Sequence, residues 1–566
     1  MNQEIYETKS CRGCKNTFHI TNADIEFYEK VSPVFNWKKY SIPSPTLCPS
    51  CREQRRLTWR NERSLYKRKC DATGEDIISV YNDSSPYKVY WIDFWWSDKW
   101  DATNFSLEYD ESISFLKQFW DLHKKVPQIP IVNDNNVWSK NCAYCNDFAF
   151  WKNCYMVIWS WHIEDSLYSL QCNHSKGIID SFSVNDSNIA YECFRSQKIY
   201  NWKHLLNCEN CTNCTFGFDL IWCNDCFWCF WLRNKSYCIF NKQYSKEEYQ
   251  DKISKMNIWN ANNLEKYKNE FKVFKLKHAV KPNYSQNCEN SIWDWLSNCK
   301  NFFGFDVHNG KDCKFFDRGD GPKDCYDIIQ SWGCNLCLEW VTPDDSFIAC
   351  YSTWVWKSKY IYYSDNCHSS SKLFGCIGLK NKSYCILNKQ YTKEEYETLV
   401  PKIIEKMRED WEWWEFFPSS MSQFGYNETV ANEYFPLTKK EALEKWFNWS
   451  DYEAPFPKVE KIIPANKLPE NITEIPDDIL NWAIECEVTK KPFRIIKPEL
   501  EFYRKHSIPI PKRHPDQRHM DRMQIRNPRH IYERTCDKCS KDVESTYAPE
   551  REEIVYCEEC YNKEIY

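Results

Sequence analysis

Residues 207–238 read NCENCTNCTFGFDLIWCNDCFWCFWLRNKSYC, a stretch in which cysteine returns at fixed intervals. Steps of 15 and of nine residues join cysteines in and beyond this stretch: Cys193, Cys208, Cys223 and Cys238, then Cys367, Cys376 and Cys385. A fixed period with small residues and Asn-rich corners is typical of a β-solenoid, in which like residues stack on like. Cysteine would serve there as a small buried hydrophobe, and a metal–thiolate cluster is the alternative interpretation.

The end of this pattern occurs a second time in the chain. WCFWLRNKSYCIFNKQYSKEEY (228–249) matches GCIGLKNKSYCILNKQYTKEEY (375–396) at 16 of 22 positions. Both copies end in a capping-box pattern, which predicts a helix after each half. The box residues are Ser245 with Glu248 and Thr392 with Glu395. The predicted fold class is therefore mainly β with α: a Cys-rich β-solenoid (β-helix) in two duplicated halves with capping helices, flanked by zinc-ribbon-like modules at both ends.

Seven segments follow from these patterns and from shifts in composition. They are an N-terminal zinc-binding module (1–130), a first solenoid half (131–244), a capping helix and linker (245–283), a second solenoid half (284–391), a capping helix (392–417), a Pro-rich connector (418–480) and a C-terminal zinc-binding module (481–566). The connector carries FGYNETVANEYFPLTKKEALEKW, which predicts no chemistry.

The cysteines at the two ends of the chain have the spacing of zinc ligands. No secretory signal precedes the 32 cysteines, and thiols in a reducing cytoplasm stay free or hold metal. The N-terminal set is Cys11, Cys14, Cys48 and Cys51, and the C-terminal set is Cys536, Cys539, Cys557 and Cys560. Four thiolates close a tetrahedral site and leave no position for water or substrate. We therefore expect zinc at two structural sites and at no catalytic site.

The two end modules are copies of each other. Residues 48–90 align with 514–556 without a gap. Each copy lacks the ligands that the other one has. The C-terminal copy keeps Cys486 and His514 but has Thr489 and Gln517, whereas the N-terminal copy keeps Cys70 but has Thr73, Trp91 and Phe94. An ancestral module with two zinc sites, of which each copy retains a different one, explains both patterns and makes His514 a leftover rather than a ligand.

Both copies also retain a row of arginines at three- and four-residue steps, which predicts a basic face on a helix. The residues are Arg52, Arg56, Arg60 and Arg63 in the first copy and Arg518, Arg522, Arg526 and Arg529 in the second. Guanidinium groups suit phosphate oxygens, so these residues are the predicted contacts to an RNA or DNA backbone. The alternative is a helix whose arginines have partners within the chain. The net charge of −5 means that any basic surface is local.

These observations predict a non-enzymatic structural-zinc protein that binds nucleic acid through its two basic helices. The alternatives are a protein-interaction scaffold without nucleic acid and a β-helix enzyme acting on carbohydrate. The enzyme hypothesis depends on a cluster within 306–327: Asp306, His308, Asp312, Asp317, Asp320, Asp324 and Asp327. No phosphate loop, nucleophile elbow or HExxH motif indicates a small-molecule substrate. No apolar run is long enough to span a membrane, so we expect a cytoplasmic protein with no membrane partner.

Four stretches together resemble one family. They are CPSCREQRRLTWRNERSLYKRKCDATG, LRNKSYCIFNKQYSKEEY, FGYNETVANEYFPLT and APEREEIVYCEECYNKEIY. The chain is similar, over nearly its whole length, to uncharacterised zinc-ribbon and β-solenoid proteins of ultra-small uncultured bacteria. The resemblance implies this architecture and no activity. Some members carry a family III CoA-transferase label, for which this sequence offers neither a CoA-binding fold nor a nucleophilic Asp.

Glycine and tryptophan depart from ordinary composition, at 12 and 28 residues. In the internal repeat, Trp228 and Trp231 lie opposite Gly375 and Gly378. In some bacteria of the group that the chain resembles, UGA is read as glycine, and reading it as tryptophan would deplete glycine. The suspected positions are Trp37, Trp159, Trp161, Trp222, Trp228, Trp231, Trp340, Trp354, Trp356, Trp411, Trp414 and Trp446. By contrast, Trp59, Trp95, Trp96 and Trp100 are expected to be genuine. An authentic tryptophan-rich surface for a partner is the alternative.

Overall fold

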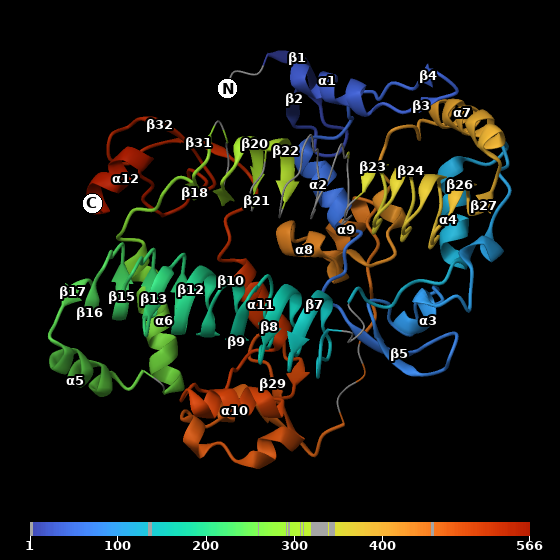
Figure 1. Cartoon of the computed structure of the whole chain (residues 1–566). Coiled ribbons are helices and arrows are strands. Elements are labelled where there is room, and N and C mark those ends of the chain that lie inside the picture. Colours follow the sequence, from blue (N-terminus) through green and yellow to red (C-terminus); the bar gives the residue numbers. More distant parts are fainter. Residues whose placement is uncertain are drawn as a thin grey trace.

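Two sets of mostly parallel strands form the middle of the molecule, and the two ends of the chain lie around them (Figure 1). The computed structural model describes residues 4–565 apart from 134–137, 259, 290, 292–294, 306, 309–310, 318–337, 339–345, 454 and 456–457, and leaves side chains undescribed at 148, 301–303, 308 and 311–317. These described parts of the chain form a mixed α/β structure with 12 α-helices.

The first set of strands, named the first stack, runs from Asn146 to Gln243. Its strands are β7 (Asn146–Lys152), β8 (Ile158–Glu164), β9 (Ser175–Ile179), β10 (Phe182–Asn185), β11 (Asn188–Tyr191), β12 (Phe194–Leu206), β13 (Glu209–Thr212), β14 (Thr215–Phe218), β15 (Asn224–Phe230), β16 (Ser236–Ile239) and β17 (Lys242–Gln243). Residues pair in parallel with residues 12 positions further on, from Asn146 with Ile158 to Asn224 with Ser236. Strand β17 pairs antiparallel with β16, so the last edge is not left open.

The second set, named the second stack, repeats this arrangement from Phe347 to Gln390. Its strands are β23 (Phe347–Cys350), β24 (Lys359–Tyr362), β25 (Ser371–Phe374), β26 (Ser383–Ile386) and β27 (Lys389–Gln390). Its parallel pairs are again 12 residues apart, as in Phe347 with Lys359, and β27 again closes the edge antiparallel. The strands before it pair at 11-residue offsets, which change to 12 within the pair β20–β22. They are β18 (Ser285–Gln286), β19 (Leu296–Ser297), β20 (Lys300–Phe305), β21 (Val307–His308) and β22 (Lys311–Asp317).

The backbone of both stacks repeats every three residues. Every third residue from Asn141 to Phe240, and again from Ile348 to Leu387, has a positive φ. The unit of the pattern is thus a triplet with one left-handed residue, and the pairing register is 12 residues. The periods of 15 and nine residues that the cysteines predicted are wrong as strand registers. Periods of 15 and nine residues are multiples of the three-residue unit but differ from the 12-residue register. They arise because cysteine occupies only some of the buried positions in the triplets.

Cysteine and serine make the same hydrogen bonds inside the stacks. Cys226 Sγ donates to the carbonyl of Asn224 at 3.3 Å, and its backbone N–H donates to Cys214 Sγ at 3.3 Å. Ser169 Oγ likewise donates to a carbonyl two residues back and accepts an N–H from 12 residues on, at 3.2 Å. The cysteines are therefore small core residues that also link successive strands. In the described parts of the chain, only the terminal cysteine groups bring three or more metal-ligand atoms within 4.8 Å of one another.

The remaining elements belong to the two end modules, the connector and the closing helices. The N-terminal elements are β1 (Ile5–Ser10), β2 (Thr17–Thr21), α1 (Asn22–Val31), β3 (Val34–Phe35), β4 (Lys38–Lys39), α2 (Pro49–Leu57), β5 (Tyr66–Lys69), β6 (Asp76–Ser79), α3 (Ile92–Trp96) and α4 (Phe115–Lys125). After the stacks come α5 (Lys246–Met256), α6 (Ala261–Lys275), α7 (Lys393–Glu409), α8 (Val430–Tyr434), α9 (Lys439–Glu444) and β28 (Lys461–Pro464). The C-terminal elements are β29 (Trp482–Glu485), β30 (Pro492–Phe493), α10 (Lys497–Lys505), α11 (Pro515–Met523), β31 (Tyr532–Thr535), β32 (Asp542–Ser545) and α12 (Glu558–Ile565).

The helices predicted after each half are present, and each begins with its capping box. Ser245 Oγ accepts the N–H of Glu248 at the start of α5, and Thr392 Oγ1 accepts that of Glu395 at the start of α7. They follow the antiparallel strands β17 and β27, which cover the last edges of the stacks. The edges are thus covered by strand pairing, not by the helices alone.

Each end module packs against the stack that lies farther away in the sequence (Figure 1). In the N-terminal module, the ring of Phe115 meets that of Phe374 in the second stack, with centroids 5.0 Å apart. In the C-terminal module, Arg518 pairs with Asp180 of the first stack. The chain is therefore interlocked, since the first module covers the last stack and the last module covers the first.

Candidate metal centres and buried arginines

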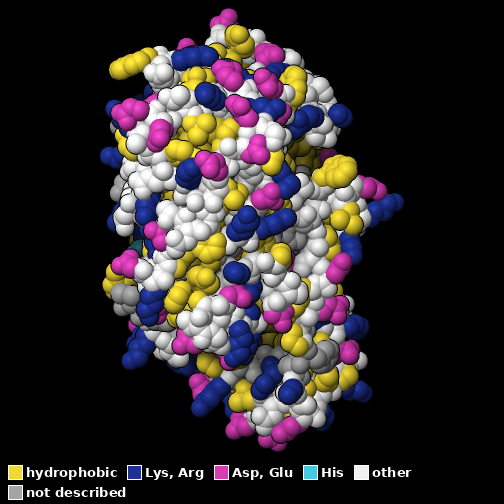
Figure 2. Space-filling view, turned by 90° about the vertical axis from the view of Figure 1, so that its right-hand side faces the viewer, with side chains coloured by type: hydrophobic (Ala, Val, Ile, Leu, Met, Phe, Trp, Pro, Cys, Tyr) yellow, Lys and Arg dark blue, Asp and Glu magenta, His cyan; other side chains and the backbone are white. Residues whose placement is uncertain are grey.

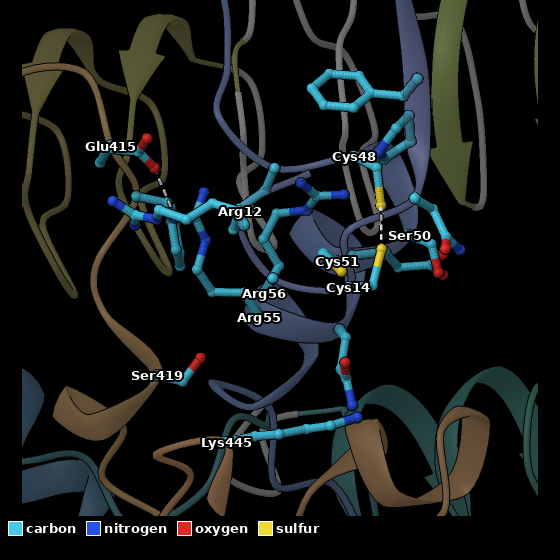
Figure 3. A pocket seen from close by; sticks show the side chains of 18 of the residues that line it. Arg12, Cys14, Cys48, Ser50, Cys51, Arg55, Arg56, Glu415, Ser419 and Lys445 are labelled. Atoms are coloured by element: carbon cyan, nitrogen blue, oxygen red, sulfur yellow. Dashed lines mark hydrogen bonds and ion pairs between the residues drawn. The ribbon is translucent and has the colours of Figure 1, made fainter. Parts of the chain in front are cut away.

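The N-terminal cysteines come together as predicted. The Sγ atoms of Cys11, Cys14, Cys48 and Cys51 all lie within 4.8 Å of one another. Cys48 is the N-cap of α2, and its backbone N–H donates to Cys11 Sγ at 3.2 Å. Figure 3 shows Cys14, Cys48 and Cys51 gathered beside α2, with Cys14 Sγ 3.6 Å from Cys48 Sγ. The group could hold one metal ion through four thiolates.

The C-terminal cysteines form a second group of the same kind. The Sγ atoms of Cys536, Cys539, Cys557 and Cys560 also lie within 4.8 Å of one another. Cys557 donates its backbone N–H to Cys536 Sγ at 3.1 Å, which matches the bond from Cys48 to Cys11 in the first group. Both predicted ligand sets are confirmed as groups that could hold a metal ion.

In each group at least one cysteine has a lowered pKa, whereas its hydrogen-bonded neighbours raise the pKa of another, Cys51 in the first group and Cys560 in the second. The hydrogen bond from Cys51, opposed by burial, lowers the pKa of Cys48 to about 5. At Cys536, burial raises the pKa, but the N–H groups of Cys557 and Cys539 outweigh it and bring the pKa down to about 6. Because a thiolate is the form that binds metal, these N–H groups prepare the sites for an ion.

The same turn follows four cysteines, two in the metal-ligand groups and two, Cys70 and Cys486, outside them. Four residues after each leading cysteine, a left-handed residue donates its N–H to the cysteine carbonyl. The pairs are Lys15 to Cys11, Ser540 to Cys536, Gly74 to Cys70 and Lys490 to Cys486, at 2.9 to 3.1 Å. Thr73 and Thr489 still donate N–H to the sulfurs of Cys70 and Cys486, at 3.4 and 3.5 Å. Threonine therefore occupies the second-ligand position of an otherwise unchanged turn.

The predicted arginine rows do not lie on single helical faces. Helix α2 ends at Leu57, so Arg60 and Arg63 follow it, and α11 ends at Met523, so Arg526 and Arg529 follow that helix. The three- and four-residue spacing of the arginines continues into irregular chain after each helix. Spacing in the sequence alone does not show where a helix ends. The prediction of one continuous basic helix in each module is wrong.

Most of these arginines are buried, not solvated. Arg52, Arg56 and Arg60 are at most 3 % exposed, and Arg518 and Arg522 are 6 % exposed. Their partners lie within the chain, as in the alternative interpretation. Arg60 pairs with Asp147 at 3.3 Å, Arg63 with Asp516 at 3.4 Å, Arg529 with Glu53, and Arg526 stacks on Tyr434 at 3.9 Å. These side chains form internal contacts and do not make up a basic surface.

The most enclosed of these contacts joins the C-terminal module to the first stack. Asp180 is fully buried and takes Arg518 at 2.5 Å on one oxygen and Arg522 at 2.8 Å on the other. Glu499 of α10, also fully buried, pairs with Arg518 at 3.2 Å and accepts the hydroxyl of Tyr168 at 3.0 Å. Burial raises the pKa of Glu499, and Arg518 opposes that shift. Two guanidinium groups and two carboxyl groups thus fasten the module to the stack.

A second buried network, which the sequence did not reveal, fastens the N-terminal module to the second stack. His123 of α4 lies 3.0 Å from Asp365 of the second stack, and both side chains are at most 2 % exposed. Gln423 of the connector lies 3.4 Å from Asp365 and reaches His123 at 2.5 Å. The three residues come from three distant segments, so no local motif could have indicated them.

A cavity of about 1290 Å³ lies beside the N-terminal cysteine group and is lined from both modules and the connector. Figure 3 shows Arg12, Arg55 and Arg56 together on one side of it, with Arg55 paired to Glu415 at 2.9 Å. Cys14, Cys48 and Cys51 line the same cavity. A divalent ion held by four thiolates would leave two negative charges, for which the guanidinium groups that line the same cavity would be counter-charges.

The acidic cluster of the enzyme hypothesis lies almost wholly outside the described residues. Asp306, Asp320, Asp324 and Asp327 belong to the undescribed segments, and the side chains of His308, Asp312 and Asp317 are not described. The structure therefore adds nothing for or against a site there.

Charges of both signs alternate over the visible surface. In Figure 2, Lys and Arg side chains are interspersed with Asp and Glu over the whole face, and no single basic field stands out. Within the described ranges, no helix combines the length and apolarity that crossing a membrane requires. Comparison with known proteins finds no family model and no curated protein that matches the chain.

Proposed function

We propose that the protein is a non-enzymatic scaffold for a protein partner, in which two zinc-ribbon-like modules fasten two β-solenoids. In this proposal the first and second stacks are duplicated solenoids with 12-residue coils. The 12-residue parallel register and the closing antiparallel strand support it, because both occur in each stack. Zinc is the proposed metal at both ends, since four sulfur ligands without an open position are the donor set of structural zinc.

The observation that carries this proposal is the inward direction of the module arginines. A surface for nucleic acid presents guanidinium groups to solvent, where they displace counterions from phosphates. Here Arg56, Arg518 and Arg522 are buried, and the last two share Asp180. Arg60 of the N-terminal module likewise pairs with Asp147 of the first stack, so contacts within the chain account for arginines in both modules. Nucleic-acid binding stays a prediction, and it would need cations other than these.

Charge reversal at one buried arginine separates the two functions. For a scaffold, Arg522→Glu places a third buried carboxyl beside Asp180 and Glu499, so we expect a lower melting temperature. We also expect no binding of labelled single-stranded RNA or duplex DNA by the wild type in fluorescence anisotropy at about 0.15 M salt. Lys440→Glu is the matched control, because Lys440 lies on exposed α9 with its side chain 86 % exposed.

The opposite result would favour the nucleic-acid function. In that case the wild type binds RNA or DNA with an affinity that falls steeply with salt, and Arg522→Glu reduces the binding while the melting temperature stays unchanged. Weaker binding in Lys440→Glu alone would place a nucleic-acid surface on the connector instead.

A further inference from the structure

Left-handed backbone positions outside the two stacks carry an unusual residue type. Within the stacks, tyrosine, phenylalanine and even isoleucine take positive φ at every third position. Among the described residues outside 141–240 and 348–387, where every third residue has a positive φ, no tyrosine or phenylalanine does so, whereas several tryptophans do. Three of these stand in exposed turns: Trp37, Trp411 and Trp446, with φ of 62°, 58° and 63°. Outside the regular three-residue pattern, tryptophan is thus the aromatic residue that has a left-handed backbone, whereas tyrosine and phenylalanine do not.

Trp37 lies in the tightest kind of hairpin. Strands β3 and β4 pair Phe35 with Lys38, which leaves the two-residue loop Asn36-Trp37. Both loop residues have positive φ, 45° and 62°. This is the conformation of a type I′ turn, for which Asn-Gly is the preferred sequence.

Trp411 and Trp446 stand directly after two helices. After α9, the N–H of Phe447 donates to the carbonyl of Ala442 at 3.0 Å, five residues back, around the left-handed Trp446. After α7, the N–H of Glu412 donates to Met407 at 2.8 Å around Trp411 in the same way. This six-to-one bond marks the helix-ending motif in which the left-handed residue is usually glycine.

The three indole rings contribute little packing in return. Trp37 is 96 % exposed, Trp411 89 % and Trp446 81 %, the highest values among the large apolar side chains of the described chain. A left-handed residue with a Cβ costs about 1–2 kcal/mol, and buried contacts are what usually offset such a cost. Trp411 and Trp446 border the cavity beside the N-terminal cysteines, so an aromatic rim for a ligand is the competing explanation, but Trp37 does not line it.

We infer that positions 37, 411 and 446 are built for glycine, and that the polypeptide made in its own cells carries glycine there. The structure also sorts the other suspected tryptophans. Trp161 and Trp356 do not have positive φ, and Trp340 lies outside the described residues. The others with positive φ lie within the stacks, where the pattern imposes that conformation (Trp159, Trp222, Trp228, Trp231 and Trp354), or are buried (Trp414, 5 % exposed). The inference is therefore limited to the three exposed turn positions.

Comparison of Trp446→Gly with Trp446→Ala tests the backbone argument. Both variants remove the indole ring, but only glycine relieves the left-handed strain. The readout is hydrogen exchange at the amide of Phe447, which opens when the helix-ending motif opens. We expect this amide to exchange roughly 5- to 30-fold more slowly in Trp446→Gly than in Trp446→Ala, the ratio that corresponds to about 1–2 kcal/mol. Position 413 is the control, because Trp413 is buried and does not have positive φ. There we expect Trp413→Gly to be less stable than Trp413→Ala.

Equal exchange in the two Trp446 variants, or faster exchange in Trp446→Gly, would overturn the structural part of the inference. The identity of the residue is read directly from the masses of peptides spanning positions 37, 411 and 446 in protein isolated from its own cells. Glycine masses support the inference, and tryptophan masses at all three positions refute it.

Discussion

Asp180 of the first stack and Arg518 of the C-terminal module are 338 residues apart in sequence and 2.5 Å apart in the structure. Asp180 also holds Arg522, so one carboxylate joins two turns of α11 to the middle of a parallel stack. A charge that is buried in this way is stable only while its counter-charges are present.

Replacing the central carboxylate should destabilise the whole assembly. Asp180→Asn leaves Arg518 and Arg522 buried with reduced compensation, so we expect the free energy of unfolding to fall by about 3–5 kcal/mol. Urea denaturation followed by tryptophan fluorescence measures the change. Asp165→Asn is the control on an exposed position of the same stack, where little change is expected. Equal stability of the two variants would show that the cluster does not fasten the module.

Metal content should depend on the terminal cysteines and not on the cysteines of the stacks. We expect two zinc ions per chain by elemental analysis, and one in Cys539→Ser. Cys226→Ser should retain both ions and nearly the wild-type melting temperature, because Ser169 Oγ makes the same bond to the carbonyl two residues back that Cys226 Sγ makes. Loss of zinc from Cys226→Ser would instead support a metal–thiolate cluster in the stack.

The turn at Cys486 should accept a metal ion when the other three ligands are supplied. Thr489, His514 and Gln517 align with the N-terminal ligands Cys14, Cys48 and Cys51, and Cys486 remains. His514 is the N-cap of α11 and is followed by proline, as Cys48 is in α2. We expect the triple variant Thr489→Cys/His514→Cys/Gln517→Cys to bind one more zinc ion than the wild type, by competition with a chromogenic chelator. Adding Cys486→Ala should remove the extra ion, and an unchanged zinc count in the triple variant would mean that the turn is no longer a metal site.

Acid should loosen the contact between the N-terminal module and the second stack. His368 is buried against Trp96 and Trp356, at ring distances of 4.7 and 4.8 Å, and burial together with Lys380 lowers its pKa to about 3. In the unfolded chain its pKa is about 6.5. The folded state favours the neutral ring, so this contribution is complete above pH 6.5 and is lost as the pH falls toward 3.

The free energy of unfolding should therefore decline by at most about 1.4 kcal/mol per pH unit through His368. His368→Phe keeps an aromatic ring without a titratable group and should show a smaller decline between pH 7 and 5 in urea titrations. Zinc release also occurs in acid, but it affects both proteins equally, so the difference between them isolates His368. An identical pH dependence would exclude this residue as the cause.

Local sequence patterns predicted the parts of the structure that local chemistry determines. The grouping of the eight terminal cysteines was correct because CxxC spacing itself sets the turn, and the capping boxes at Ser245 and Thr392 were correct for the same reason. The three-residue unit of the stacks was not found, since cysteine marks only some of the positions that serine, valine and isoleucine also occupy.

Long-range pairing was beyond the reach of the sequence. Nothing near Arg518 indicates Asp180, and nothing near His123 indicates Asp365, which is 242 residues away. The arginine spacing was real, but spacing alone does not show whether a face meets water or another part of the chain. The burial of these arginines therefore had to come from the structure.

The interlocked order of modules and stacks has a consequence for synthesis on the ribosome. The N-terminal module leaves the ribosome first, but the stack that it covers begins only at Phe347. The first stack is in turn covered by α11, which begins at Pro515 and is made much later than the stack. Both partially built faces stay exposed through most of translation, and contacts this distant in sequence form slowly. We therefore expect the nascent chain to need chaperone protection until its last residues emerge.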